Sequence, residues 1–193
     1  ICCLIWVPIG VKIGLHPTMA TKLQPVIQFM AAFPANLLFP MFVLLIVRHQ
    51  LNVDIWTAPL LVLGTQWYIL FNVIAGTQAL PKHLHHACRL FGVKDLLWWR
   101  KLVLPGIFPH MLTGIISAAG GAWNASILAE AISWGHTTLY ANGLGAYISY
   151  CQSHGQFINM TLGIIIMCCY VLLINRFVWQ PLYHKAQQRF QCF

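Results

Sequence analysis

The stretch FINMTLGIIIMCCYVLLINRFV, residues 157–178, carries a single charged side chain, Arg176, near its end. A run of about 20 mainly apolar residues is long enough to cross the hydrocarbon core of a bilayer as a helix. In water such a surface would have to be covered by other protein, whereas lipid covers it directly. This stretch therefore predicts a transmembrane helix, and it sets the expected class of the whole chain: an all-α, polytopic transmembrane helix bundle.

The composition of the chain favours the same class. Of its 193 residues, 59% are hydrophobic and 7% are charged, and the mean hydropathy is +0.72. A soluble domain carries about 25% charged residues, and a disordered chain combines low hydrophobicity with high charge. The composition therefore excludes an ordinary soluble enzyme and a disordered protein, and we expect one transmembrane domain over residues 1–193.

Four other apolar runs extend the expected bundle. Residues 25–47, 55–77 and 102–125 are each long enough to cross a bilayer, whereas residues 1–11 are too short and predict the end of a span. Because the chain opens inside this last run and without a Met, we expect the sequence to begin partway through a longer polypeptide.

Prolines interrupt two of these runs. Each proline removes a backbone donor and kinks or breaks a helix. The sequence therefore predicts breaks at Pro34 and Pro40, and further breaks near the start of the next long run, at Pro105 and Pro109.

The basic residues predict how the bundle is oriented. Residues 81–101 hold five of the eleven Lys and Arg side chains. If this loop is cytoplasmic, alternation of the spans places residues 12–24 and the C-terminal tail on the same side. Ten of the eleven basic residues then share that side, and only Arg48 lies outside. Cytoplasmic loops of membrane proteins carry this excess, so the formal charge of +8 needs no nucleic acid partner.

Within the basic loop, the segment LPKHLHHACRLFG, residues 80–92, predicts a short helix. Pro81 suits a first helical turn, and Gly92 suits the left-handed residue after the last turn. An apolar face with spacings of three and four consists of Leu84, Ala87, Cys88 and Phe91. A helix this short is marginal alone, so its apolar face packs either in a partner's groove or against the chain's own bundle.

The same segment resembles the EAA loop of ABC-transporter permease subunits. The family pattern is Glu-Ala-Ala, three residues, Gly, nine residues, an aliphatic residue, one residue, and Leu-Pro. His86-Ala87-Cys88, then Gly92, then Leu102-x-Leu104-Pro105 follow this spacing throughout.

Three other segments are similar to permeases of the nitrate/sulfonate/taurine type. They are Leu23-Gln24-Pro25 with the prolines up to Pro40, Gly121-Ala122-Trp123-Asn124 with Ala129-Glu130, and residues 175–183. With the loop they follow one another in the family's order, and together they cover nearly the whole chain from about Thr21.

The resemblance implies a short cytoplasmic coupling helix that docks on an ABC ATPase subunit, so that ATP binding switches the bundle between inward and outward access. It implies cytoplasmic ATPase subunits, a second permease half (an identical copy or a fused homologous domain), and a solute-binding protein that meets residues 126–156 outside. ATP and Mg would be bound by the ATPase and no cofactor by this chain, which has no G-x-x-x-x-G-K-[ST] loop. The expected location is the bacterial inner membrane, with the C-terminus in the cytoplasm.

This sequence departs from the family pattern at two positions of the loop. His86 stands where the family has Glu, and Cys88 stands where it has the second Ala. The first change removes an anionic partner for basic groups on an ATPase, and coupling there would be weaker or would use another residue.

Polar residues at membrane depth are candidates for a translocation path. They include Asn36, Asn72 and Asn124, and Glu130 lies near the outer end of a span. An acidic group beside hydrocarbon is a functional candidate. Hydrogen bonds between helices explain the same residues, and for Glu130 we favour that explanation.

The sequence predicts neither a metal site nor a catalytic centre. Of His83, His85 and His86, only the first and last share a helix face, and no carboxylate or thiolate completes a ligand set. An alternative function is a secondary carrier or a channel without ATP coupling, but an ion-driven carrier keeps ionisable groups inside the membrane, and this chain has almost none. A membrane-embedded enzyme would need clustered His or acidic side chains.

Overall fold

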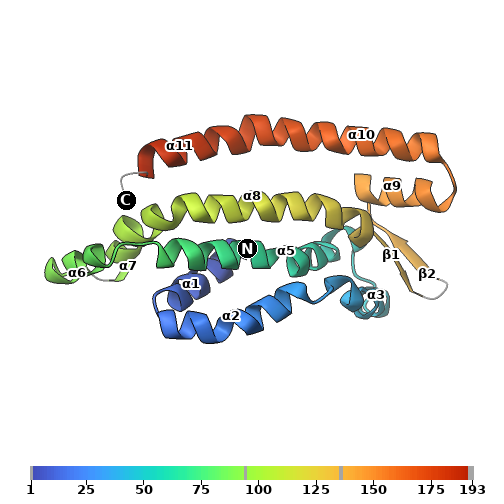
Figure 1. Cartoon of the computed structure of the whole chain (residues 1–193). Helices are drawn as coiled ribbons and strands as arrows, with labels where there is room; N and C mark the ends of the chain where they lie inside the picture. Colours follow the sequence, from blue (N-terminus) through green and yellow to red (C-terminus); the bar gives the residue numbers. More distant parts are fainter. Residues whose placement is uncertain (1, 94, 135–136, 191–193) are drawn as a thin grey trace. The chain divides into compact units, whose positions relative to one another are not determined.

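The computed structural model describes residues 2–93, 95–134 and 137–190, and it is helical apart from one short hairpin (Figure 1). Ile1 of the expected first span and Lys94 of the basic loop lie outside the described residues. The expected all-α class is confirmed, with candidate membrane-spanning helices and a short helix in the basic loop.

The described elements follow one another along the chain in this order: α1 Cys2–Gly14, α2 Pro17–Ala32, a 3-10 turn Ala35–Leu38, α3 Phe39–Arg48, α4 Val53–Trp56, α5 Ala58–Gln78, α6 Lys82–Leu90, α7 Asp95–Trp98, a π-helical turn Trp99–Val103, α8 Leu104–Ala129, β1 Ala131–Trp134, β2 Thr137–Tyr140, α9 Leu144–Ser153, α10 Phe157–Ile174, a second π-helical turn Asn175–Trp179, and α11 Gln180–Phe190.

Among the described residues, three helical stretches are long and apolar enough to cross a membrane. They are Val53–Gln78, Asp95–Ala129 and Phe157–Gln188, and the pair α2 and α3 makes a fourth if it is one broken span. The runs expected at 55–77, 102–125 and 157–178 fall inside the three long stretches. The run at 25–47 falls on the broken pair, and the run at 1–11 falls on α1, a helix of 13 residues.

The prolines act differently in the two runs. Around Pro34 the helix stops, and Pro34 itself has extended backbone angles. Pro40 sits in the first turn of α3, where its missing N–H would have no intrahelical partner. The breaks predicted at Pro105 and Pro109 are wrong, because the helix continues to Ala129. The π-helical turn just before Pro105 already shifts the hydrogen-bond register, and membrane helices accommodate an internal proline such as Pro109.

The described residues form two compact units. The first contains residues 1–30, 66–118 and 177–193, and the second contains residues 31–65 and 119–176.

In the first unit, α1 packs closely against α5 through two glycines one helical turn apart. A Cβ atom on Gly10 would lie 2.7 Å from Cγ1 of Val73, and one on Gly14 would lie 2.6 Å from Cβ of Thr77. Small residues four apart let two helix backbones approach closely in a membrane protein. The sequence pattern Gly-x-x-x-Gly therefore has a packing role here.

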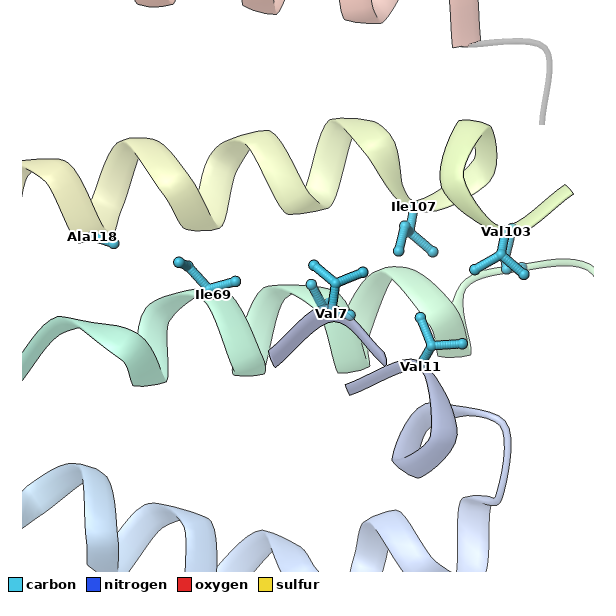
Figure 2. Close-up of a cluster of buried hydrophobic side chains, with 8 residues drawn as sticks. Val7, Val11, Ile69, Val103, Ile107 and Ala118 are labelled. Carbon is cyan, nitrogen blue, oxygen red and sulfur yellow. The ribbon is translucent and has the colours of Figure 1, made fainter. Parts of the chain in front are cut away.

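The same part of α5 packs against α8, which runs antiparallel to it. A Cβ atom on Gly76 would meet His110, and one on Gly114 would meet Asn72 and the carbonyl of Tyr68. Figure 2 shows the apolar cluster where α1, α5 and the start of α8 meet. The members labelled there are Val7, Val11, Ile69, Val103, Ile107 and Ala118.

The second unit holds its own core and the hairpin. Val43 of α3, Leu60 of α5, Ala129 and Ile132 form a buried cluster. Strands β1 and β2 pair antiparallel, with Ala131 opposite Tyr140. α9 packs on α10, where a Cβ atom on Gly163 would lie 2.9 Å from Ile148.

Filling the α1–α5 contact should destabilise the first unit. Gly14→Val places a branched side chain against Thr77 and the carbonyl of Ile74, and overpacking of this kind costs about 1–3 kcal/mol. We expect a lower midpoint of thermal unfolding for the detergent-purified protein. Gly64→Val is the matched control, because Gly64 lies in α5 with no neighbouring atom within 4 Å; equal losses for both variants would contradict the packing role.

Candidate functional site

The helix expected in the basic loop is present, and its end is fixed by backbone bonds. α6 begins after Pro81 and ends at Leu90. The N–H of Gly92 donates to the carbonyl of Arg89 at 3.2 Å, and the N–H of Val93 donates to the carbonyl of Cys88 at 2.9 Å. Gly92 has φ +65°. These two bonds and the left-handed residue are the Schellman motif, so a glycine is needed at this position for a conformational reason.

The apolar residues of the loop divide into two groups. Leu84, Ala87 and Cys88 are half-buried against the chain itself. A second group, here called the apolar patch, is exposed on the surface of the chain, and its members are Leu90 (87% exposed), Phe91 (84%), Leu96 (79%) and Leu97 (51%). The last two lie in the first turn of the candidate span Asp95–Ala129. The face predicted from the sequence is therefore divided, with Phe91 in the exposed group. Packing against the chain itself is therefore seen for one group, and docking of the other group on a partner stays a prediction.

His86 and its neighbour His85 differ in their surroundings. His86, which stands at the family's glutamate position, is exposed. His85 is half-buried, and its ring lies 6.0 Å from that of Trp98. This partial burial, and after it the positive charge of Arg89, lowers the pKa of His85 below its usual value. This shift favours the neutral form of His85, and the permanent positive charge on α6 comes from its Lys and Arg side chains.

The loop joins the first unit's core through two tryptophans. Trp98 and Trp99 are partly buried and pack against the cluster of Figure 2. Leu102 is buried, Pro105 is half-buried, and Leu104 is partly exposed. The Leu-Pro end of the motif thus lies where the loop becomes the long helix.

The candidate path residues are divided between the two units, and their assignment to a path stays a prediction. Asn36 and Asn124 are exposed, and both lie in the second unit. Asn72 lies in the first unit, where its side-chain amide donates to the carbonyl of Tyr68 at 2.8 Å.

Glu130 makes a structural contact in the second unit. Its Oε2 accepts a hydrogen bond from the N–H of Ala146, in the first turn of α9, at 3.0 Å. The residue before that helix is Gly143, which has no side chain to cap it. A carboxylate at a helix N-terminus satisfies an unpaired N–H and favours the helix dipole. The structure thus gives Glu130 the interhelical role that the sequence favoured.

A second carboxylate holds the same segment, and sequence reasoning missed it. Asp54 accepts from the backbone N–H of Asn142 at 2.7 Å and from its side-chain amide at 3.1 Å. Two of the chain's three acidic residues therefore bind residues 141–146. The small number of acidic residues marked each of them as a candidate for a specific contact. Because Asp54 and Asn142 are 88 positions apart, no local pattern predicts that they pair.

Residues 126–156 also contain the hairpin, which the sequence reading did not predict. Each strand has only four residues, and runs so short carry too little alternation to be recognised. In residues 2–93, 95–134 and 137–190, no group of three His, Cys, Asp or Glu side chains is placed to hold a metal ion.

Comparison with known proteins identifies the family. The model of the family described as "Binding-protein-dependent transport system inner membrane component" matches residues 7–179. The chain belongs to this family. The match begins within α1, includes the basic loop and α9, and ends within the candidate span Phe157–Gln188.

Three curated relatives describe the branch of the family. A bicarbonate transport system permease protein from Synechococcus elongatus is 25% identical over 178 residues, which is 92% of this chain and 61% of the relative. A nitrate import permease protein from Leptolyngbya laminosa is 26% identical over 89% of this chain and 58% of the relative. A taurine transport system permease protein from Escherichia coli is 26% identical over 79% of this chain and 50% of the relative.

The chain is thus an ABC permease of the nitrate/sulfonate type, as the resemblance implied. It spans between half and about three fifths of the length of these three relatives. 

Two substitutions distinguish a cap from a path residue at Glu130. Glu130→Gln keeps an acceptor oxygen, so the unfolding midpoint should change little, whereas Glu130→Ala leaves the Ala146 N–H unpaired and should cost about 1 kcal/mol. Chemical unfolding of the purified protein in detergent measures both. A large loss of solute uptake by Glu130→Gln at unchanged stability would instead assign Glu130 to the path.

Proposed function

We propose that this chain is a membrane-spanning permease subunit of an ATP-driven importer. It would move a small solute across the bacterial inner membrane by alternating access. The family match over residues 7–179 supports this proposal most strongly. ATP and Mg would be bound by separate ATPase subunits, and a second permease half would complete the pathway.

The apolar patch supports docking of the loop on an ATPase. Leu90 and Phe91, the two members of the patch outside the candidate spans, are exposed at the fixed end of a short helix, as is typical of a surface that a partner covers. In this proposal Phe91 and its neighbours enter a groove on the ATPase, and Trp98 and Trp99 transmit the movement to α8. Because His86 replaces the family's Glu, apolar contact would contribute more here than an ion pair at that position.

The other parts of the proposal follow from the orientation. The loop and the C-terminal tail would lie in the cytoplasm, as the distribution of basic residues predicts. Residues 126–156 would then face outward, toward a solute-binding protein.

The names of the three relatives refer to bicarbonate, nitrate and taurine, each of which carries an anionic group, so we propose a small anionic solute.

Replacing Gly92 should uncouple ATP hydrolysis from transport. A β-branched residue in the left-handed region costs about 1–2 kcal/mol and would displace the exposed end of α6 from its docked position. For Gly92→Val, we expect the solute moved per ATP hydrolysed in reconstituted vesicles to fall roughly tenfold.

Gly155→Val is the matched control for this prediction. Gly155 has φ +67° and open space around it, as Gly92 has, but it lies between α9 and α10. Both variants therefore carry the same backbone strain. Normal coupling in Gly92→Val, or equal uncoupling in both, would contradict the docking proposal.

A cysteine in the apolar patch should crosslink to the ATPase. Phe91→Cys places a thiol on a position that is 84% exposed, so a short bifunctional reagent should join the two subunits in high yield. Leu84→Cys is half-buried against the chain itself and should react less. The experiment uses a Cys88→Ala background, and ATP should change the yield of the crosslink at position 91.

If the purified complex contains no ATPase at all, the alternative function of a secondary carrier or a channel would be favoured.

A further inference from the structure

The first unit contains a cavity of about 940 Å³ beside α6. Its walls come from the turn between α1 and α2, the end of α5, one face of α6, and α7. It lies on the other side of α6 from Phe91 and the rest of the apolar patch, none of which lines it. The cavity is therefore distinct from the proposed docking surface.

The position of the cavity along the helices sets its depth in a membrane. It is lined by Gln78, the last residue of one candidate span, and by Asp95, the first residue of another. Trp98 also lines it, and tryptophan favours the layer between hydrocarbon and water. From these span ends and the tryptophan we infer that the cavity lies near the level of the lipid headgroups.

The lining contains both basic and apolar side chains. Lys82 and Arg89 carry permanent positive charges, and three histidines lie among the same lining residues. Asp95 is the single acidic residue among the described lining residues. Leu15, Leu80 and Val93 supply apolar surface. A bound molecule would therefore meet positive charge and hydrocarbon together.

We propose that this cavity binds an anionic phospholipid, with its phosphate between Lys82 and Arg89 and its acyl chains leaving along the spans. Basic pockets between transmembrane helices at the headgroup level bind acidic lipids in this way. An inorganic anion would use the charges but neither the apolar wall nor most of the volume. The inference rests on the spans and the cavity, and it holds whether or not an ATPase docks on the apolar patch.

Lipid retention tests the proposal. The full-length protein, with any subunits that copurify, is reconstituted into nanodiscs of mixed phosphatidylglycerol and phosphatidylcholine and then released into mild detergent. Native mass spectrometry counts the lipids that remain bound. We expect at least one retained phosphatidylglycerol, and the double variant Lys82→Gln/Arg89→Gln should weaken the preference for it roughly 20-fold.

Lys12→Gln/Lys22→Gln is the matched control. It removes the same charge from exposed positions that do not line the cavity, and the loop orientation predicts that they lie on the same side of the membrane. This control should retain phosphatidylglycerol as the unchanged protein does. Equal loss in both double variants would overturn the proposal, because general attraction to an acidic surface would then explain the binding.

Two further measurements test for other occupants of the cavity. If inorganic phosphate added at millimolar concentration displaces the retained lipid completely, the site binds free anions and the proposal fails. If Lys82→Gln/Arg89→Gln releases an ATPase subunit without changing lipid retention, the basic wall is a protein contact and the proposal also fails. Retained lipid in the presence of phosphate, lost only in the cavity variant, supports it.

Discussion

Close contact between helix backbones at α5 is the constraint on which the first unit depends. Gly10 and Gly14 bring α1 against one part of this helix, and the antiparallel α8 meets it at Gly76 and Gly114. Between helices in lipid the hydrophobic effect gives little drive, so packing of this kind carries much of the association energy. The core cluster fills the space that these contacts leave.

The basic loop gains its order from that packing. By length alone α6 would be marginal in water, but Leu84, Ala87 and Cys88 rest against the first unit and the Schellman bonds close its end. The loop then presents two different surfaces. One is the exposed apolar patch, which we propose meets a protein partner, and the other is a cavity with basic lining between the ends of two candidate spans.

The second unit is organised by a different interaction. The carboxylates of Asp54 and Glu130 together bind the segment that follows the hairpin and leads into α9. In a chain with three acidic residues, using two of them in this way leaves few for moving ions across a membrane. This observation favours an externally driven permease over an ion-coupled carrier.

The sequence by itself determined the helical membrane class, the short helix in the loop and its glycine end, because hydropathy, helical spacing and backbone conformation are local properties. It also carried the spacing of the family motif. The tertiary structure alone decided which side of α6 is covered, that α8 continues through Pro109, and that Glu130 caps α9. These three features depend either on groups that are distant in the sequence or on a shift of the helical hydrogen-bond register. Such causes produce no periodic pattern of residues in the sequence. The hairpin and the bond from Asp54 to Asn142 were missed for the same reason, since strands of four residues and a contact across 88 positions have no local signature.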